Sequence, residues 1–407
     1  EIFDLADSLE VLNLSGNALS SLPDDLPRLH KLRVLFCSDN PFVELPAVLG
    51  RCQALEMIGF KANRICHVPA DALPPRLRWL ILTDNQIDAL PAEIGQCSQL
   101  QKLMLAGNQL SQLPSTLANC RRLELLRISA NRFESMPEWL PSMPRLTWLA
   151  CAGNPMERVV VPPPAAAPVP WHALVIDGLL GEGASGRIYR AHWQRDGAAA
   201  VPLAVKLFKG EVTSDGWPQS ELAASLAAGR HPNLIPVVGP LAGHPQGTAG
   251  LVMHFIPPTF KTLAGPPSLA SCTRDVYAAG TRFAPATVAR IARGVAAAGA
   301  HLHARGILHG DLYAHNLQCD ADGHCLLGDM GAGSFLPDDA ARSQALQRLE
   351  VRAFGCLLEE LLQHADGTRG SGTHQAWSAL RDDCLTETVS ARPLYAEVVQ
   401  RLQTLSP

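Results

Sequence analysis

The sequence predicts two domains, an α/β solenoid of stacked repeats followed by an α+β domain. Three observations lead to this prediction. A leucine and asparagine pattern recurs seven times within residues 1–156, a Pro/Ala-rich stretch at 157–170 reads as a linker, and the repeats stop at Trp171. After that point strand-like runs surround a glycine-rich loop, and apolar residues with helical 3–4 spacing appear further along. The length of 407 residues also exceeds that of one ordinary domain.

The repeat has the form L-x-x-L-x-L-x-x-N-x-L, with a spacing of 23 residues and once 22. One unit cannot bury its own leucines, so stacked units must share a continuous core. We expect each asparagine to bond backbone groups of neighbouring turns, which would otherwise be buried unpaired. The asparagines are Asn17, Asn40, Asn63, Asn85, Asn108, Asn131 and Asn154. Seven units in register resemble the leucine-rich-repeat family, which implies a horseshoe-shaped solenoid.

The open face of the repeat strands is the candidate binding surface. Six of the seven residues that stand two after each first leucine are apolar, and an apolar strip facing water usually marks a binding site. The strip comprises Val11, Val34, Met57, Trp79, Lys102, Leu125 and Trp148, with Phe36, Ile81 and Met104 two residues further along. We expect it to bind a protein partner or, as the alternative, the chain's own second domain.

Composition excludes several other classes of partner. The net charge is −4 and no Lys/Arg block is present, which argues against nucleic acid. The apolar stretches are shorter than the roughly 20 residues that cross a bilayer, so we expect no membrane span. Eleven scattered cysteines, an odd number, predict buried thiols in a reducing compartment rather than a disulfide framework. We therefore expect a cytoplasmic protein, with delivery into a host cell as the alternative, and its Ala-, Arg-, Leu- and Pro-rich composition suggests a bacterial genome.

The first motif of the second domain is a glycine-rich loop at residues 181–186, with the form G-x-G-x-x-G. Alone it is weak evidence, because it also opens dinucleotide-binding folds, in which a helix follows the last glycine. Here residues 187–192 and 202–208 look like strands instead. This order of strand, glycine loop and strand resembles protein kinases, in which the loop covers the phosphates of ATP.

Three further motifs extend the resemblance over residues 174–404. Leu203–Lys206 resembles the kinase strand that carries the phosphate-binding lysine, His309–Asn316 resembles the catalytic loop, and Asp329–Gly331 is a variant of Asp-Phe-Gly. Glu221 lies in a helical stretch, and Glu350 resembles the acidic residue at the start of the long central helix. The resemblance implies a bilobal α+β fold.

The resemblance also assigns roles to single residues. Asp311 would be the catalytic base, and Lys206 would contact the α- and β-phosphates while paired with Glu221. Asn316 and Asp329 would bind Mg²⁺, with Mn²⁺ as the alternative metal. The residues implied in ATP binding are Leu180, Gly181, Gly183, Gly186, Ile188, Ala204, Lys206 and Met253.

The chain departs from the kinase pattern at three places. Gly310 replaces the arginine that binds a phosphorylated activation loop, so we expect activity without that phosphorylation. Tyr313 replaces a lysine that would help to neutralise the γ-phosphate. The segment between Asp329 and Glu350 is short and has no Ala-Pro-Glu, which removes the usual glutamate partner of Arg392 and leaves the substrate class open.

These observations predict an ATP-dependent protein kinase that acts on serine or threonine, with repeats that bind protein. Two alternatives stay open. His-Gly-Asp also occurs in small-molecule kinases that resemble aminoglycoside and choline phosphotransferases, although the glycine loop, Asp329–Gly331 and Arg392-Pro393 speak against that class. The other alternative is a pseudokinase scaffold that binds nucleotide and displays the repeats, against which the intact Lys206, Asp311 and Asn316 speak.

Overall fold

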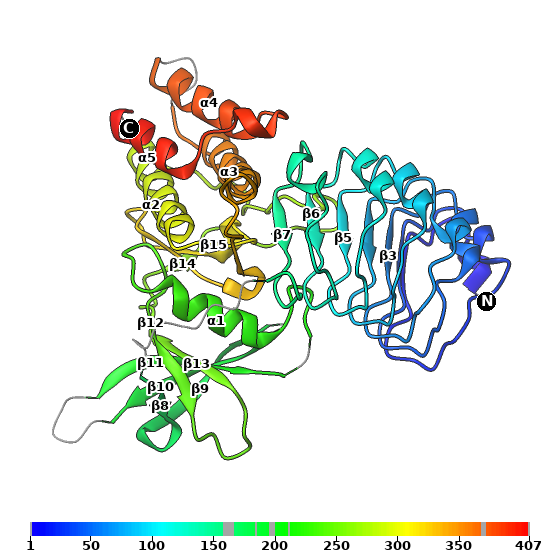
Figure 1. The fold of residues 1–407 in the computed structure, drawn as a ribbon, viewed down its shortest axis with the longest axis horizontal. Helices are drawn as coiled ribbons and strands as arrows, with labels where there is room; N and C mark the ends of the chain where they lie inside the picture. The colour runs from blue at the N-terminus through cyan, green and yellow to red at the C-terminus, as the bar shows by residue number, and fades with distance from the viewer. Residues whose placement is uncertain are drawn as a thin grey trace. The chain divides into compact units, whose positions relative to one another are not determined.

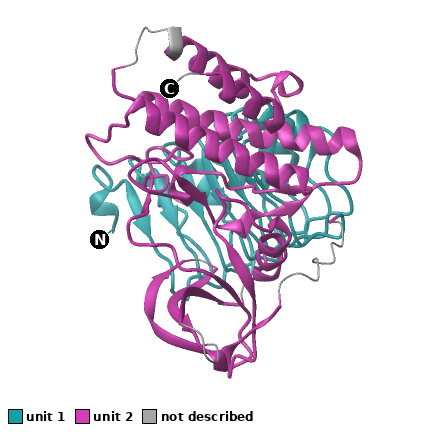
Figure 2. Cartoon of the chain, turned by 90° about the vertical axis from the view of Figure 1, so that its left-hand side faces the viewer, with its two compact units in different colours: residues 1–156, 212–216 teal, residues 157–211, 217–407 magenta. Residues whose placement is uncertain are grey.

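The chain divides into two compact units (Figure 1). The computed structural model describes residues 2–157, 167–183, 185–194, 200–210, 212–367 and 372–405. Unit 1 comprises residues 1–156 together with the short segment 212–216, and unit 2 comprises residues 157–211 and 217–407 (Figure 2).

Unit 1 is the predicted α/β solenoid. Seven of its described strands form one parallel sheet in sequence order, and each strand pairs in register with the next, so that Leu103 lies between Leu80 and Leu126. The strands are β1 (Val11–Asn13), β2 (Val34–Phe36), β3 (Met57–Gly59), β4 (Trp79–Ile81), β5 (Lys102–Met104), β6 (Leu125–Arg127) and β7 (Trp148–Ala150).

A short 3-10 helix lies between each pair of successive repeat strands, and one more precedes β1. These helices are η1 (Ile2–Leu5), η2 (Leu26–Arg28), η3 (Ala47–Arg51), η4 (Ala70–Ala72), η5 (Ala92–Gln96), η6 (Ser115–Asn119) and η7 (Leu140–Ser142). Three of them begin directly after the proline of a Leu-Pro pair, at Pro46, Pro91 and Pro114. A repeat of 23 residues leaves room for only three to five helical residues, the usual length of a 3-10 helix.

The repeat asparagines form the expected ladder of side-chain hydrogen bonds. Asn108 shows the pattern: its Nδ2 donates to the carbonyls of Leu82 and Leu105, both at 2.9 Å, and its Oδ1 accepts from the amide of Ile87 at 3.0 Å. Equivalent bonds across the turns are made by Asn40, Asn63, Asn85, Asn131 and Asn154. The asparagines are therefore structural, as the sequence predicts.

Replacing Asn108 with alanine should destabilise unit 1, because three buried backbone groups lose their partner. We expect the free energy of unfolding to fall by about 1–3 kcal/mol, the cost of leaving a buried polar group unsatisfied. Urea unfolding followed by tryptophan fluorescence measures the loss. Asn17→Ala in the exposed first repeat is the matched control, and an equal loss in both variants would contradict a ladder whose strength depends on burial.

The strand face is less open than the sequence predicts. Val11 is 48% exposed, but Met57, Lys102, Leu125 and Trp148 are buried. Large side chains of adjacent strands cover one another: the Lys102 ammonium lies 4.4 Å from the centre of the Trp79 ring, and Trp79 Nε1 is 3.3 Å from Met104 Sδ. The strip is therefore not exposed along its whole length, and binding of a protein partner or of the second domain to it stays a prediction.

The first half of unit 2 is a six-stranded sheet in the order β8–β12–β13–β11–β10–β9. Its strands are β8 (Val169–Pro170), β9 (Leu174–Glu182), β10 (Gly186–Trp193), β11 (Val201–Phe208), β12 (Val237–Ala242) and β13 (Gly250–His254), with the 3-10 turn η8 (Trp171–Ala173) before β9 and helix α1 (Pro218–Ala228) after β11. The last two residues of the expected linker form β8, and Val169 is buried in the core of this sheet. Residues 158–166 of that linker lie outside the described residues.

The second half of unit 2 is mainly helical. Its helices are α2 (Pro285–Ala304), α3 (Ala340–Gln363), α4 (Gly372–Leu385) and α5 (Tyr395–Thr404). The short elements are β14 (Lys261–Thr262), β15 (Ile307–Leu308), η9 (Ala314–Asn316), β16 (Leu317–Cys319), β17 (Cys325–Leu327), η10 (Met330–Ala332), β18 (Ser334–Phe335) and η11 (Val389–Ala391). Strands first and helices after give the α+β bilobal fold that the sequence predicts.

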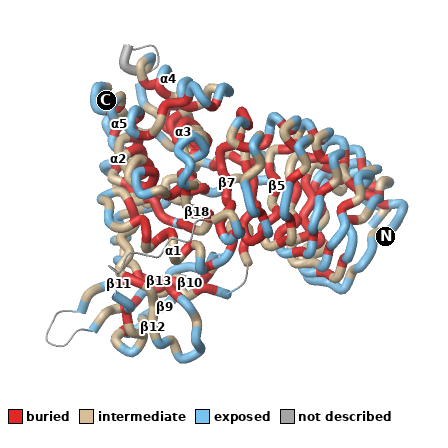
Figure 3. Tube along the Cα trace, viewed as in Figure 1, coloured by how far each residue is buried: buried red, intermediate tan, exposed pale blue. Residues whose placement is uncertain are grey.

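The long helices bury the faces that their sequence marks as apolar (Figure 3). The 3–4 spaced residues of α2 and α3 are all buried: Val288, Ile291, Val295, Ala298, Leu302, Leu346, Leu349, Ala353, Leu357 and Leu361. Of the helices that the structure describes, none has both the length and the apolar character required to cross a bilayer.

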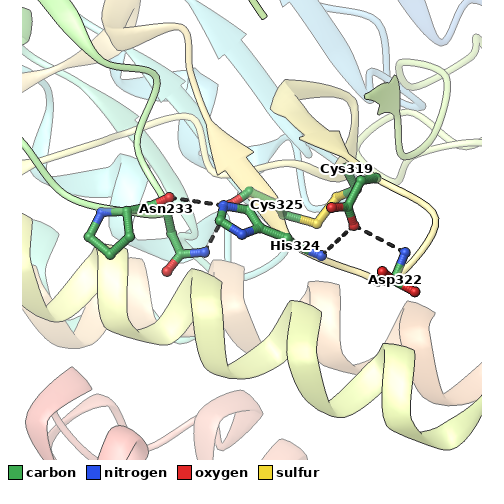
Figure 4. Close-up of a disulfide and its surroundings, with 7 residues drawn as sticks. Asn233, Cys319, Asp322, His324 and Cys325 are labelled. Carbon is green, nitrogen blue, oxygen red and sulfur yellow. Dashed lines mark hydrogen bonds between the residues drawn. A yellow bond between two sulfur atoms is a disulfide. The ribbon is translucent and has the colours of Figure 1, made fainter. Parts of the chain in front are cut away.

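Most of the cysteines are buried thiols, as predicted, but Cys66 and one disulfide depart from the prediction. Eight of the nine free cysteines are buried, and Cys66 is the exposed one. Cys319 and Cys325 form a disulfide that the sequence does not predict (Figure 4). They are cross-strand partners in the β16–β17 hairpin, with Cα atoms 4.1 Å apart. The two cysteines pair because the hairpin places them opposite each other. No cysteine motif in the sequence indicates this pairing.

Candidate functional site

Strand β11 and helix α1 bring Lys206 and Glu221 together. The Lys206 Nζ bonds the Glu221 carboxylate, and both side chains are less than a tenth exposed. Helix α1 begins with Pro218, which suits a first turn, and ends at Gly229 with φ of +66°. Burial raises the pKa of Glu221 and the nearby Asp329 carboxylate adds to this, whereas Lys206 opposes it. A buried lysine held by one carboxylate suits an ammonium that meets phosphate groups.

The residues of the His309–Asn316 loop are ordered by hydrogen bonds within the loop. Asn316 Nδ2 donates to Asp311 Oδ2 at 2.9 Å and to the Asp311 carbonyl at 2.8 Å. The fully buried His309 accepts from the Asp311 amide at Nδ1 and donates from Nε2 to the carbonyl of Gly328. His309 thus connects the loop that carries Asp311 to the residue before Asp329.

Glu350 holds the same loop from helix α3. Its carboxylate accepts from the Gly310 amide and from His303 Nε2, both at 2.6 Å, and the residue is 4% exposed. Burial opposes ionisation, but His303, His309 and the Gly310 amide hold the pKa of Glu350 below its ordinary value. Glu350 does not start the central helix as predicted, because Asp339 caps α3 earlier by accepting from the Arg342 amide.

Asp329 lies at the end of the hairpin that follows Asn316. The β16–β17 hairpin is closed by Cys319–Cys325, and Asn233 Nδ2 donates to the Cys325 carbonyl at 3.0 Å (Figure 4). Asp329 has φ of +55°, and its exposed carboxylate accepts from the Gly331 amide at 3.2 Å. A non-glycine residue in this conformation is uncommon and frequently functional. Met330, which stands where the Asp-Phe-Gly motif has phenylalanine, is buried.

One polar pair beside the catalytic loop has no signature in the sequence. Asp275 Oδ1 lies 2.7 Å from His315 Nδ1, and its other oxygen accepts from the His315 amide. Burial opposes protonation of His315, but Asp275 and then Asp311 and Asp329 raise its pKa. Asp275 lies far from the catalytic loop in sequence and has no motif around it, so only the fold reveals the pair.

A cavity of about 140 Å³ unites part of the predicted site. Ile188, Lys206, Glu221, Met253 and Asp329 line it. Ala204 pairs with Met253 across β11 and β13, and Gly186 lies against the carbonyl of Leu207. The remaining predicted nucleotide residues lie on the glycine-loop side and do not line this cavity: Leu180, Gly181 and Gly183. Ala184 of that loop lies outside the described residues.

The donor set fits a nucleotide with a hard divalent cation. Asn316 donates from its side-chain nitrogen to Asp311, and its side-chain oxygen is an atom of the kind that binds such a metal. Asp329 has an exposed carboxylate. Oxygen ligands of this kind are those that Mg²⁺ prefers. The buried Lys206 supplies a positive charge for phosphate.

Asp329→Ala should weaken Mg²⁺-dependent nucleotide binding by at least about tenfold, or 1.4 kcal/mol, because a carboxylate ligand is lost. Calorimetric titration with ATP, in Mg²⁺ and in chelator, measures the effect. Asp322→Ala, on the exposed turn of the same hairpin, is the control and should bind as the wild type does. Unchanged Mg²⁺ dependence in Asp329→Ala would remove this residue from the metal site.

The departures from the kinase pattern have local structural causes. Gly310 adopts φ of +74° while its amide bonds Glu350, a conformation that glycine adopts readily and arginine rarely. Tyr313 is buried, with its ring 4.9 Å from that of His315. Arg392 is buried and donates to the carbonyls of Thr386 and Arg348, and this burial lowers its pKa to about 10.

Comparison with known proteins assigns both parts of the chain. Residues 174–364 match the family model for protein tyrosine and serine/threonine kinases, and residues 8–29 and 75–133 match models for leucine-rich repeats. The serine/threonine-protein kinase PITSLRE of Drosophila melanogaster is 29% identical over 152 residues, 37% of this chain and 15% of that protein.

Two other relatives match shorter stretches of the chain. The human leucine-rich repeat-containing G-protein coupled receptor 6 is 46% identical over 65 residues, 16% of this chain and 7% of the receptor. A protein phosphatase PHLPP-like protein of Drosophila melanogaster is 35% identical over 99 residues, 23% of this chain and 10% of that protein. The chain therefore spans at most 15% of the length of these relatives. The expected bacterial origin is not borne out by them.

Proposed function

Because the chain carries leucine-rich repeats and a protein kinase domain, we propose that it transfers the γ-phosphate of ATP to serine or threonine hydroxyls of proteins. The observation that carries this proposal is a group of contacts around the cavity that Lys206, Glu221 and Asp329 line. Lys206 pairs with Glu221, Asn316 bonds Asp311, and His309 connects the Asp311 loop to Gly328 beside Asp329.

Each member of the set has a role in the proposed reaction. Lys206, oriented by Glu221, holds the α- and β-phosphates. Asn316 and Asp329 would hold Mg²⁺, or Mn²⁺, which when bound neutralises charge that develops on the phosphates. Asp311 orients the substrate hydroxyl and accepts its proton as the new P–O bond forms and the bond to ADP breaks. The set has the minimum that phosphoryl transfer requires, positioning and charge neutralisation.

The remaining proposals concern regulation, partners and location. Gly310 provides no side chain for an activation-loop phosphate, so we propose basal activity without phosphorylation after Asp329. The repeats are proposed to bind protein, the usual role of solenoid surfaces. Eight buried, unbridged cysteines support a reducing, cytoplasmic location, whereas the Cys319–Cys325 disulfide speaks against it.

Labelled ATP added to the purified chain with a cell lysate tests the function. We expect label on serine or threonine of lysate proteins. Label on a small molecule would favour the small-molecule kinase instead. Mg·ATP binding with no label transferred to any acceptor would favour the pseudokinase scaffold.

A further inference from the structure

The segment Val212–Gly216 is part of unit 1 although it lies between β11 and α1 in sequence (Figure 2). It folds into a tight turn: the Thr213 amide and hydroxyl both donate to the Gly216 carbonyl, and the Asp215 amide donates to the Thr213 hydroxyl. Gly210, two residues before the segment, has φ of +81°, and Gly216, its last residue, has φ of +131°. The segment is therefore a defined structure with permissive backbone at both ends.

The turn fits closely against the ends of strands β5 and β6. A Cβ at Gly107 would stand 2.6 Å from Val212 Cγ1, and a Cβ at Gly216 would stand 2.8 Å from Ser129 Cβ. Both distances are too short for a real side chain, so glycine at these two positions permits the approach. Thr213 between them is 5% exposed.

An ion pair accompanies this fit. Arg127 Nε lies 2.9 Å from Asp215 Oδ1, with the arginine side chain 3% exposed and the aspartate side chain 29% exposed. A guanidinium removed from water is costly unless a charged or polar group meets it. Asp215 supplies such a charge, so the end of β6 is suited to an acidic turn.

Helix α1 starts two residues after this turn and carries Glu221 in its first turn. The other end of α1 is bonded within unit 2, where His301 Nε2 is 2.7 Å from the Ala228 carbonyl and Arg305 Nε donates to the Ala227 carbonyl at 2.8 Å. The chain before α1 is thus bonded to the repeats, and the end of α1 is bonded to helix α2 and the residue after it.

We propose that Arg127 is a positioning residue for phosphoryl transfer. By holding Asp215, it fixes the chain that enters α1 and so keeps Glu221 on Lys206. The repeats therefore support the active site by binding the segment Val212–Gly216 of the same chain, in addition to any partner that they bind. This inference rests on the proposed function, since the Lys206–Glu221 pair must be in place for transfer.

The test uses the full chain and two measurements, the transfer rate and amide hydrogen exchange of residues 221–228. Asp215→Asn should lower kcat by about tenfold or more while changing the affinity for Mg·ATP by less than about threefold, because Lys206 loses orientation but not its charge. It should also speed exchange in α1. Gly216→Ala keeps both charges, adds a methyl group against Ser129, and should give the same two changes.

The double variant Arg127→Asp with Asp215→Arg should restore kcat and slow exchange relative to Asp215→Asn, a rescue that a general loss of stability would not show. Arg28→Gln with Asp25→Asn removes an exposed pair of unit 1 and is the control. Wild-type kcat and exchange in both Asp215→Asn and Gly216→Ala would overturn the proposal. If the wild-type chain transfers no phosphate but the variants still change amide exchange in α1, the proposed kinase function is refuted. The proposal that the Arg127–Asp215 contact fixes the chain that enters α1 is then still supported.

Discussion

Asp311→Asn should reduce phosphoryl transfer by about 10²–10⁴-fold, the range that a general base contributes. Asparagine has the shape of aspartate, and its side-chain oxygen can still accept from Asn316 Nδ2, as Asp311 Oδ2 does at 2.9 Å. It cannot take up the proton of a hydroxyl nucleophile as a carboxylate does. Single-turnover transfer from labelled ATP to a lysate protein that the wild-type chain phosphorylates measures the loss.

The same variant separates chemistry from binding. Affinity for Mg·ATP should stay within about threefold of wild type, because Lys206, Asn316 and Asp329, and not Asp311, are the residues proposed to bind the phosphates and the metal. Asp382→Asn on the exposed side of α4 is the matched control, and it should leave both quantities unchanged. Transfer by Asp311→Asn at the wild-type rate would show that another group accepts the proton or that deprotonation does not limit the reaction.

The repeats could be predicted closely because each unit carries its own signal. Leucines at fixed offsets mark the core, and each asparagine reaches a backbone only one repeat away, as Asn108 does to Leu82. Such contacts recur at a constant sequence distance, so a single chain displays them. The exposure of the strand face was harder to predict, since it depends on which large side chains, such as Lys102 over Trp79, cover one another.

The motifs of the candidate site could be predicted from the sequence, but the contacts that hold them in place could not. Lys206, Asp311 and Asp329 stand in recognisable local patterns. Asp275, which binds His315, lies 40 residues before it in sequence, and the Arg127–Asp215 pair joins residues further apart still. Such contacts depend on how elements pack, and no local pattern in one sequence indicates a partner at that distance.

Glu350→Ala should strongly destabilise unit 2. The carboxylate is buried and holds both the Gly310 amide and His303, so its removal leaves two buried polar groups without it. Breaking a buried pair of this kind costs about 3–5 kcal/mol. Urea unfolding monitored by amide exchange in α3 measures the free energy, and transfer should be lost because the Asp311 loop loses its support.

The pH dependence of this stability provides the sharper test of the same contact. The folded state holds the pKa of Glu350 below its ordinary value, so the unfolded chain binds its proton at higher pH than the folded chain. The stabilisation is therefore fully present above the unfolded pKa, about 4.3, and is lost as pH falls through the lower folded value. Glu350→Gln can still accept from Gly310 but does not titrate, so its stability should fall less steeply below about pH 4.5 than that of the wild type. Parallel acid-unfolding curves for wild type and Glu350→Gln would mean that the Glu350 carboxylate is not the group that stabilises the loop.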